Sequence, residues 1–300
     1  MLSAYLQLHF IVLIWGFTAI LGRLINLSPV EIVLYRTLIA VIGIYFLLKL
    51  KGMPVNLNRN DALPILGTGI LIALHWVTFF LAARVSNISI CLAGLATTSF
   101  WTSMIDPLIN KRRIKFYEPL LGLFSVVGIV IVFNASIDSY VGLVIAIISA
   151  ILSALFTVIN GRLIKKQNHY TITYYEMIGA FLTTVVLLPF YQLIYADQPF
   201  RWITNGMDIF YLLILGLICT VYAYSVGVKI MHKLSAFTIN LTINLEPVYG
   251  IIMAVLLFSS EEKMGSNFYI GTSIIMISVL LYPLVRKIFH DRYLDTDVLN

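Results

Sequence analysis

The chain has 300 residues, of which 60% are hydrophobic and 11% are charged. A composition this apolar excludes an ordinary soluble globular domain, because such a surface is stable only in contact with lipid. The net charge of +6 does not require a nucleic-acid partner, since the basic residues concentrate in the loops on one side of the predicted membrane spans.

The apolar runs predict ten transmembrane helices, and therefore an all-α membrane protein. Crossing a hydrocarbon core of about 30 Å takes about 20 helical residues, which is the length of these runs. The runs also lack the alternation of polar and apolar residues that is typical of a strand. The first seven residues have no basic region, so no cleavable signal peptide is expected. We place the spans at residues 5–25, 29–48, 62–83, 87–109, 117–135, 141–162, 171–195, 207–228, 234–258 and 267–288.

The distribution of Lys and Arg orients these spans. If the N-terminus is inside, fifteen basic residues lie in cytoplasmic segments, four lie outside and Arg36 lies within a span. Cytoplasmic loops of membrane proteins are enriched in Lys and Arg. The bias therefore predicts that both termini are cytoplasmic, with residues 291–300 as a cytoplasmic tail. We expect a multi-pass protein of the cell (inner) membrane.

The two halves of the chain resemble each other. The tetrapeptide Gly-Arg-Leu-Ile at 22–25 recurs 139 positions later at 161–164, and Leu-Gly at 66–67 aligns with 215–216 at a shift of 149. We expect two repeats, residues 1–135 and 136–290, with five spans each. An odd number of spans turns the second repeat upside down relative to the first. This plan predicts a transporter of inverted repeats, with a substrate site near the bilayer midplane between them.

No motif in the sequence indicates an enzyme, a cofactor or a metal site. A Gly-x-x-x-x-Gly-Lys-Ser/Thr loop is absent, so ATP-driven transport by this chain alone is not expected. Cys91 and Cys219 fall inside spans, and we interpret them as small core residues rather than as a disulfide or metal pair. The five histidines show no ligand-like spacing.

Several short motifs resemble those of a known family. They are Trp15-Gly16 in the first span, Pro29 followed by Arg36 and Ala40 in the second, and NLEPVYGIIMAVLLFSSEE at 244–262. In order, spacing and repetition they resemble the EamA family, a ten-span branch of the drug/metabolite transporter superfamily. The resemblance covers essentially the whole chain and implies export of amino acids or other small metabolites. It does not specify the substrate, because nucleotide-sugar and phosphate-ester carriers are more distant relatives.

Ionisable residues inside the spans are the strongest site candidates, because a charge within a membrane needs a partner or water. Glu246 and His75 both fall near the midplane, Glu246 at roughly 18 Å from the inner boundary. We interpret Glu246 as a site for a substrate amine or a proton, with His75 as its polar neighbour. The alternative is that Glu246 is a structural acid that braces a kink at Pro247.

Arg36 and Glu176 occupy equivalent positions in the two repeats. Inversion leaves them roughly 10 Å apart in depth, so a direct salt bridge is not expected. Arg36 either holds a substrate carboxylate near the outer vestibule or caps helix carbonyls. Glu176 is expected to be shallow enough to snorkel to the interface.

Aromatic and polar side chains complete the predicted cavity. Rings inside the spans suit a small amphipathic or zwitterionic solute, although packing alone explains any single ring equally well. Asn244 lies one helical turn from Asn240 on the same polar stretch as Glu246. Thr98 belongs to the Thr-Thr pair that stands in the first repeat where the second has Glu246-Pro247. The ring candidates are Trp15, Trp76, Trp101, Tyr222 and Tyr224.

These features favour a secondary transporter that exports small metabolites such as amino acids by alternating access through a midplane cavity. The alternatives are an integral-membrane enzyme, a channel, or a carrier for drug-like cations, nucleotide sugars or phosphate esters. Proton coupling through Glu246 and uniport are both open, as are the direction of transport and the choice between monomer and homodimer. The expected partners are a small-molecule substrate and the lipid bilayer.

Overall fold

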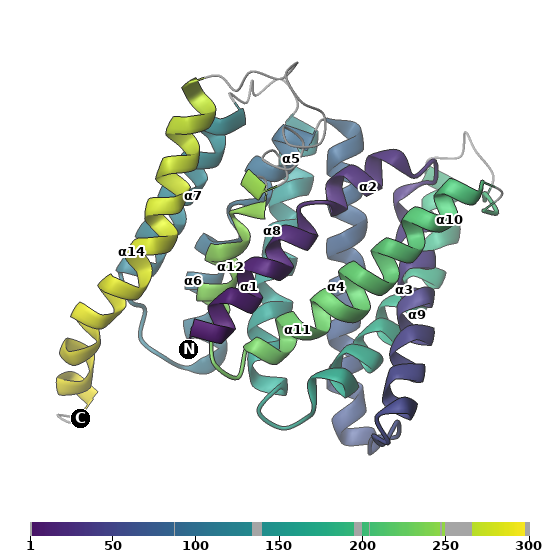
Figure 1. Cartoon of the computed structure of the whole chain (residues 1–300), viewed down its shortest axis with the longest axis horizontal. Coiled ribbons are helices and arrows are strands. Elements are labelled where there is room, and N and C mark those ends of the chain that lie inside the picture. Colours follow the sequence, from purple (N-terminus) through teal and green to yellow (C-terminus); the bar gives the residue numbers. More distant parts are fainter. Residues whose placement is uncertain are drawn as a thin grey trace.

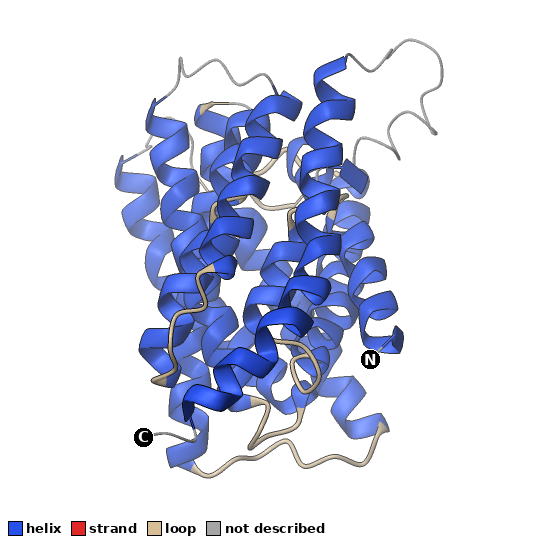
Figure 2. Cartoon of the chain, turned by 90° about the vertical axis from the view of Figure 1, so that its left-hand side faces the viewer, coloured by secondary structure: helices blue, strands red, loops and turns tan. Residues whose placement is uncertain are grey.

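The computed structural model describes residues 2–86, 88–133, 140–194, 200–203, 205–246, 248–249 and 266–297. Within these ranges every regular element is a helix, and the helices stand side by side in one bundle (Figure 2). Pro247, most of the 244–262 motif and the last three residues of the predicted tail lie outside the described residues. The predicted kink at Pro247 therefore stays a prediction.

The first half begins with a broken helix. α1 (Leu2–Trp15) and α2 (Thr18–Leu24) are separated at Gly16-Phe17, where the hydroxyl of Thr18 donates to the carbonyl of Trp15 at 2.7 Å. A second break, at Ala96-Thr97, separates α5 (Ile88–Leu95) from α6 (Thr98–Asn110). Both breaks interrupt a predicted span near its middle, and the residues that flank them face the interior.

The remaining helices of the first half are continuous. α3 (Pro29–Leu50) opens with a capping box in which the Ser28 side chain accepts from the amide of Glu31 and the Glu31 carboxylate accepts from the amide of Ser28. Proline at the first helical position costs no hydrogen bond, so this start is well defined. α4 (Arg59–Val85) and α7 (Tyr117–Phe133) follow.

The second half contains one irregular helix among regular ones. α8 (Tyr140–Leu163) and α9 (His169–Ile194) are regular, and α12 (Ala236–Ile243) and α14 (Ser266–Asp297) close the half. Between α9 and α12, the predicted eighth span is built from α10 (Gly206–Leu213), the π-helix η1 (Ile214–Tyr222) and α11 (Ala223–Ile230). The hydroxyl of Thr220 donates to the carbonyl of Leu215, five residues earlier, at 2.8 Å.

Seven of the described helical segments are long and apolar enough to cross a membrane. They correspond to the predicted spans 5–25, 29–48, 62–83, 141–162, 171–195, 207–228 and 267–288. The other three predictions differ for separate reasons. Span 87–109 is broken, span 117–135 is a shorter apolar helix, and span 234–258 leaves the described residues after 249. The helical class is confirmed, whereas the count of ten and the cytoplasmic location of the termini stay predictions.

The two halves of the chain are packed into each other (Figure 1). In the first half, α4 contacts both α8 and α9 of the second, and α3 contacts α9. Similarly, α1 contacts α11, α6 contacts α12, and α7 lies along α14. These are the pairings that a twofold relation between residues 1–135 and 136–290 would produce. The interior between the halves is therefore walled by helices from both.

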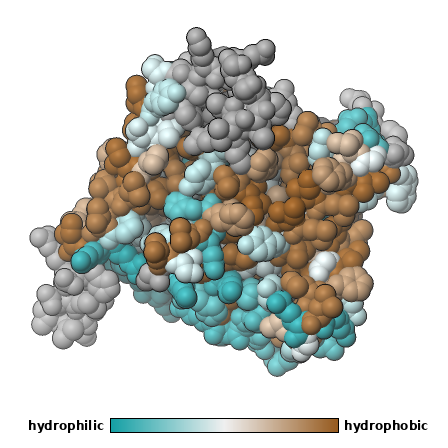
Figure 3. Space-filling view, in the orientation of Figure 1, coloured by the Kyte–Doolittle hydropathy of each residue, from teal (hydrophilic) through white to brown (hydrophobic). Residues whose placement is uncertain are grey.

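The outer surface of the bundle is apolar. Large hydrophobic side chains are exposed on several helices, among them Phe124 on α7, Phe190 on α9 and Leu284 on α14. In Figure 3 apolar residues cover much of the visible face, and hydrophilic residues collect along its lower edge. An apolar belt with a polar end is the surface that a protein embedded in a bilayer requires.

Candidate functional site

A cavity lies between the two halves, with an empty volume of about 840 Å³ that includes space open to solvent. Helices α1 to α6 contribute to its wall from the first half, and α8, α11 and α12 contribute from the second. Seven of the ten predicted site residues line it. They are Trp15, Arg36, His75, Trp76, Thr98, Tyr224 and Glu246.

Arg36 on α3 is a buried cation on the wall of this cavity. Its side chain is 3% exposed, and Nε donates to the hydroxyl of Thr220 at 2.8 Å. The guanidinium carbon lies 3.7 Å from the ring centroid of Trp76, in cation–π geometry. Within the described part of the chain no carboxylate forms an ion pair with Arg36. A guanidinium held only by a hydroxyl and a ring can bind an anionic group of a solute.

Glu246 places a carboxyl group on the same cavity. It is 8% exposed, and Oε1 accepts a 3.4 Å hydrogen bond from the hydroxyl of Thr18. That hydroxyl also donates to the carbonyl of Trp15, and a hydroxyl has a single proton to give. The bond to Glu246 is therefore weak, which leaves the carboxyl group available to a ligand. Glu246 also borders a smaller neighbouring space of about 220 Å³, together with Asn244.

His75 on α4 lines the cavity and joins the two halves. Its Nδ1 lies 2.9 Å from the carbonyl of Ser149 on α8, and the hydroxyl of Ser149 lies 2.9 Å from the carbonyl of His75. A carbonyl can only accept, so this contact puts the proton on Nδ1. The ring also packs against Phe156 at 5.4 Å between centroids. His75 thus lines the cavity and has a structural role between the halves.

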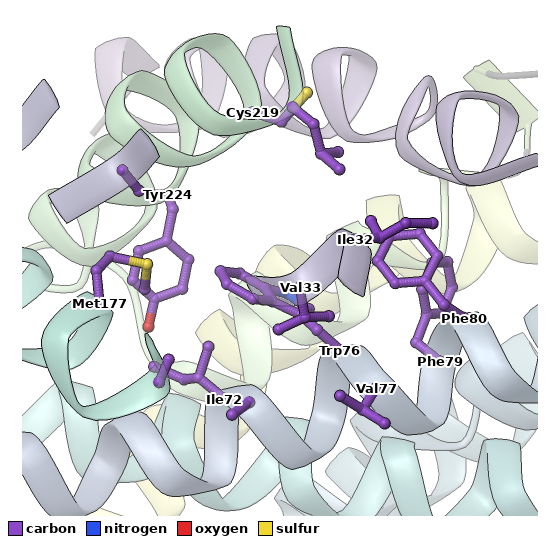
Figure 4. Close-up of a cluster of buried hydrophobic side chains, with 14 of the residues drawn as sticks. Ile32, Val33, Ile72, Trp76, Val77, Phe79, Phe80, Met177, Cys219 and Tyr224 are labelled. Atoms are coloured by element: carbon purple, nitrogen blue, oxygen red, sulfur yellow. The ribbon is translucent and has the colours of Figure 1, made fainter. Parts of the chain in front are cut away.

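Aromatic rings form one side of the cavity. Trp76 and Tyr224 meet edge to face at 6.2 Å, and Figure 4 shows them pointing toward one another from α4 and α11. Phe156 packs against Tyr224 at 6.3 Å, and Trp15 donates from Nε1 to the carbonyl of Cys219 at 3.1 Å. Each ring is fixed by a neighbour, so the wall presents preformed faces to a solute.

The polar stretch of α12 turns its amides toward α6. Asn240 donates to the hydroxyl of Thr102 at 2.7 Å, and Asn244 donates to the hydroxyl of Ser99 at 3.1 Å. All four side chains are buried. Asn244 therefore reaches the smaller space beside Glu246 while it holds α12 against α6.

Three expectations about individual residues are wrong. Tyr222 is 48% exposed and packs edge to face on Phe10 at the surface, because residues two apart on a helix, such as Tyr222 and the cavity residue Tyr224, lie on opposite faces. Trp101 bonds to the hydroxyl of Thr97 at 3.2 Å and does not line the cavity. Glu176 is 0% exposed and accepts from the hydroxyl of Tyr224 at 3.1 Å, so it does not snorkel.

The structure also adds polar residues that sequence reasoning missed. Thr18, Ser153 and Thr157 line the cavity. On α8, Ser149, Ser153 and Thr157 recur every four residues in a largely apolar helix. Such spacing puts polar groups on one helical face, so the signal for this part of the wall was present in the sequence. Within the described ranges no three His, Cys, Asp or Glu side chains gather as metal ligands.

Comparison with known proteins gives a consistent result. An uncharacterized transporter of Archaeoglobus fulgidus is 21% identical over 95% of this chain and 100% of its own length. Another, of Clostridium kluyveri, is 24% identical over 79% of this chain and 78% of its own length. A solved crystal structure superposes with a TM-score of 0.76 at 15% identity, over 95% of this chain and 98% of that one. At that identity the likeness is one of fold alone.

The model of the EamA-like transporter family matches residues 2–134 and again residues 140–283. The two matches together span nearly the whole chain and include every residue of the cavity described above. They agree with the apolar helices, the inward-facing polar groups and the relatives named as transporters. The protein is therefore a multi-pass membrane transporter, and the chain belongs to the EamA-like transporter family.

Proposed function

We propose that the protein is a secondary transporter that exports small zwitterionic metabolites such as amino acids by alternating access. One observation carries the proposal. A single cavity between the halves holds a buried guanidinium, a buried carboxyl group and a wall of aromatic rings. An α-amino acid has a carboxylate for Arg36, an ammonium group for Glu246 and a side chain for the rings.

The contacts between the halves support the alternating-access part of the proposal. Residues 1–135 and 136–290 are the predicted inverted repeats, and helices in equivalent places meet across the centre, as α3 meets α9 and α6 meets α12. Rocking one repeat against the other would move these contacts while the cavity stays between them. The cavity would then face each side of the membrane in turn.

Proton coupling through Glu246 belongs to the same proposal. A carboxyl group with a weak hydrogen bond on a solute cavity can exchange a proton for a substrate ammonium group. Both ligands compete for the same oxygen atoms, which is the requirement for exchange. The proton gradient would then drive the solute outward.

The test is transport of a labelled amino-acid panel by the purified protein in proteoliposomes, with and without a pH gradient. We expect gradient-driven movement in the native protein and its loss in Glu246→Gln. Amino-acid amides, which lack the carboxylate, and carboxylic acids with the same side chain but no amine should compete poorly with the amino acid. Tyr222→Phe, which changes a surface ring, is the matched control and should behave like the native protein. If no member of the panel moves, the proposed substrate class is wrong.

A further inference from the structure

A buried acid lies behind the cavity wall and takes no part in the solute site. Glu176 on α9 is completely buried and does not line the cavity. Its Oε2 accepts from the hydroxyl of Tyr224 at 3.1 Å, whereas its Oε1 is buried without a hydrogen-bond partner. A carboxylate in an apolar interior requires several donors or a cation. Among the described residues one of the two oxygens of Glu176 has no hydrogen-bond partner, which favours the neutral, protonated acid.

The charged and titratable groups around Glu176 do not neutralise it. Arg36 on α3 is bound to Thr220 and stacked on Trp76, and His75 on α4 is bound to Ser149. Glu246, on the segment after α12, lines the cavity, which Glu176 does not. On α9 itself, Tyr175 accepts from the amide of Leu57 at 3.0 Å. Among the described residues none of these groups forms an ion pair with Glu176.

A hydrogen-bonded chain connects this acid to the cavity. The amide of Asn160 donates to the hydroxyl of Tyr224 at 2.9 Å, and that hydroxyl donates to Glu176. Tyr224 lines the cavity and its hydroxyl is bonded to the acid, so this residue connects the solute space to Glu176. The Oδ1 atom of Asn160 also lacks a partner, which leaves a second acceptor without a donor in the same cluster. The cluster as a whole therefore has two buried acceptor oxygens without a hydrogen-bond donor.

From this arrangement, and resting on the transport function proposed above, we propose that Glu176 is a second proton-binding site of the transporter, filled from the cavity through the hydroxyl of Tyr224. A protonated water (H3O⁺) in the cavity gives its extra proton to the phenol oxygen and becomes neutral water, while the phenol passes its own proton to the carboxylate oxygen Oε2 of Glu176. Tyr224 is a neutral phenol before and after the step, and Glu176 becomes a neutral acid. Release reverses the two transfers.

The relation between the halves gives the second site a distinct place. Glu176 of the second half aligns with Arg36 of the first. Tyr224 aligns with His75, at the same shift of 149 positions that aligns Gly67 with Gly216. The first half thus contributes a fixed cation to the cavity wall, and the second contributes an acid that can be charged or neutral. Protonation of Glu176 changes the net charge around the cavity without occupying the solute site.

Infrared difference spectroscopy tests the proton site directly and needs no substrate. The purified protein in lipid is taken from alkaline to acidic pH, and the C=O stretching band of protonated carboxyl groups is recorded. We expect Glu176→Gln to remove one component of this band and Glu246→Gln to remove a different one. The matched control is Asp208→Asn. It removes a carboxylate that does not line the cavity and that accepts from the backbone amide of Asn26, and it should retain both components. A band unchanged in Glu176→Gln overturns the proposal, even if transport itself is observed.

Two further measurements test the route and its use. After a rapid pH jump, the Glu176 component should rise more slowly in Tyr224→Phe than in the native protein, and an equal rate would overturn the route through Tyr224. In proteoliposomes, Glu176→Gln should lose accumulation driven by a pH gradient while counterflow of labelled solute remains measurable, which also shows that the variant is folded. Full gradient-driven accumulation in Glu176→Gln would overturn the role in coupling. Absence of all transport in the native protein would instead contradict the proposed function.

Discussion

Arg36 is a buried side chain whose environment depends on the shape of guanidinium as well as on its charge. The planar group stacks on Trp76 and donates sideways to Thr220. A lysine ammonium carries the same charge but has no plane to stack and a different donor geometry. The two residue types are therefore not equivalent at this position.

Arg36→Lys should weaken binding of carboxylate-bearing solutes by about 1–2 kcal/mol, which is roughly a tenfold rise in the concentration for half-maximal transport. The measurement is the concentration dependence of uptake in proteoliposomes. Arg59→Lys, at an exposed position at the start of α4, serves as the control. An unchanged concentration dependence in Arg36→Lys would indicate that Arg36 does not contact the solute.

Arg112, in the loop between α6 and α7, is a charged residue with a structural role. Its Nη2 lies 2.7 Å from Asp106 and 2.6 Å from Glu118, which is almost completely buried. Burial lowers the pKa of Arg112, but the carboxylates of Glu118 and Asp106 raise it more, so the net pKa is raised. The guanidinium is thus firmly charged and ties the end of α6 to the start of α7.

Removing this cation should destabilise the protein, because two carboxylates then lose their shared partner. We expect Arg112→Gln to lower the free energy of unfolding by about 2 kcal/mol. Arg113→Gln is the matched control, since the neighbouring side chain is exposed. The measurement is the midpoint of thermal unfolding in detergent. Equal midpoints for the two variants would show that the ion pairs contribute nothing.

At the scale of elements, the crossing of α4 and α9 controls the distance between the cavity wall and the buried acid. A Cβ atom added to Gly69 would lie 2.7 Å from the amide nitrogen of Ala180 and 2.8 Å from the Cα of Gly179. Both atoms belong to the backbone, so they cannot move aside without moving the helix. α4 carries His75 and Trp76, and α9 carries Glu176, so this contact sets their separation.

Gly69→Ala should therefore push α4 away from α9 and cost about 1–3 kcal/mol. Gly67→Ala, two residues earlier, is the control, because a Cβ atom there meets nothing within 4 Å. Thermal unfolding of the two variants in detergent is the measurement. If Gly69→Ala is as stable as Gly67→Ala, the close contact is not maintained in the membrane.

The length of the apolar runs could be predicted from the sequence, whereas the surroundings of single residues could not. Apolar runs of about 20 residues are visible in any sequence, so the helical class and seven membrane-length segments could be predicted. Tyr222 was misplaced because it is two residues from Tyr224, and side chains at that spacing lie on opposite faces of a helix. The sequence does not distinguish Gly67, which is open, from Gly69, which makes the close contact, since the crossing point depends on partners far away in the chain. Glu176 was misjudged because depth alone does not say whether neighbours cover a side chain.

At the scale of the whole molecule, the proposed mechanism predicts that the cavity opens to one side of the membrane at a time. A single cysteine at Thr98, which lines the cavity, reports this. The two native cysteines, Cys91 and Cys219, are buried and are replaced first. Impermeant reagents added from each side should label Thr98→Cys from one side, and solute should change the preferred side.

The control is Asn60→Cys, at an exposed position near the start of α4. It should be labelled from one side whether or not solute is present. Simultaneous labelling of Thr98→Cys from both sides would fit a channel and contradict alternating access. If solute does not change the side from which Thr98→Cys is labelled, access to the cavity is not coupled to transport.

The hydrogen bonds between α6 and α12 also bear on how the protein is synthesised. In the predicted ninth span, Asn240 and Asn244 bring two amide groups into the bilayer, where unpaired donors are unfavourable. Their acceptors, Thr102 and Ser99, lie on a helix that leaves the ribosome more than a hundred residues earlier. The nascent α12 thus enters a membrane in which its partner is already inserted. A circular permutant that delivers α12 before α6 reverses this order, and more of its newly made chains should be degraded before assembly.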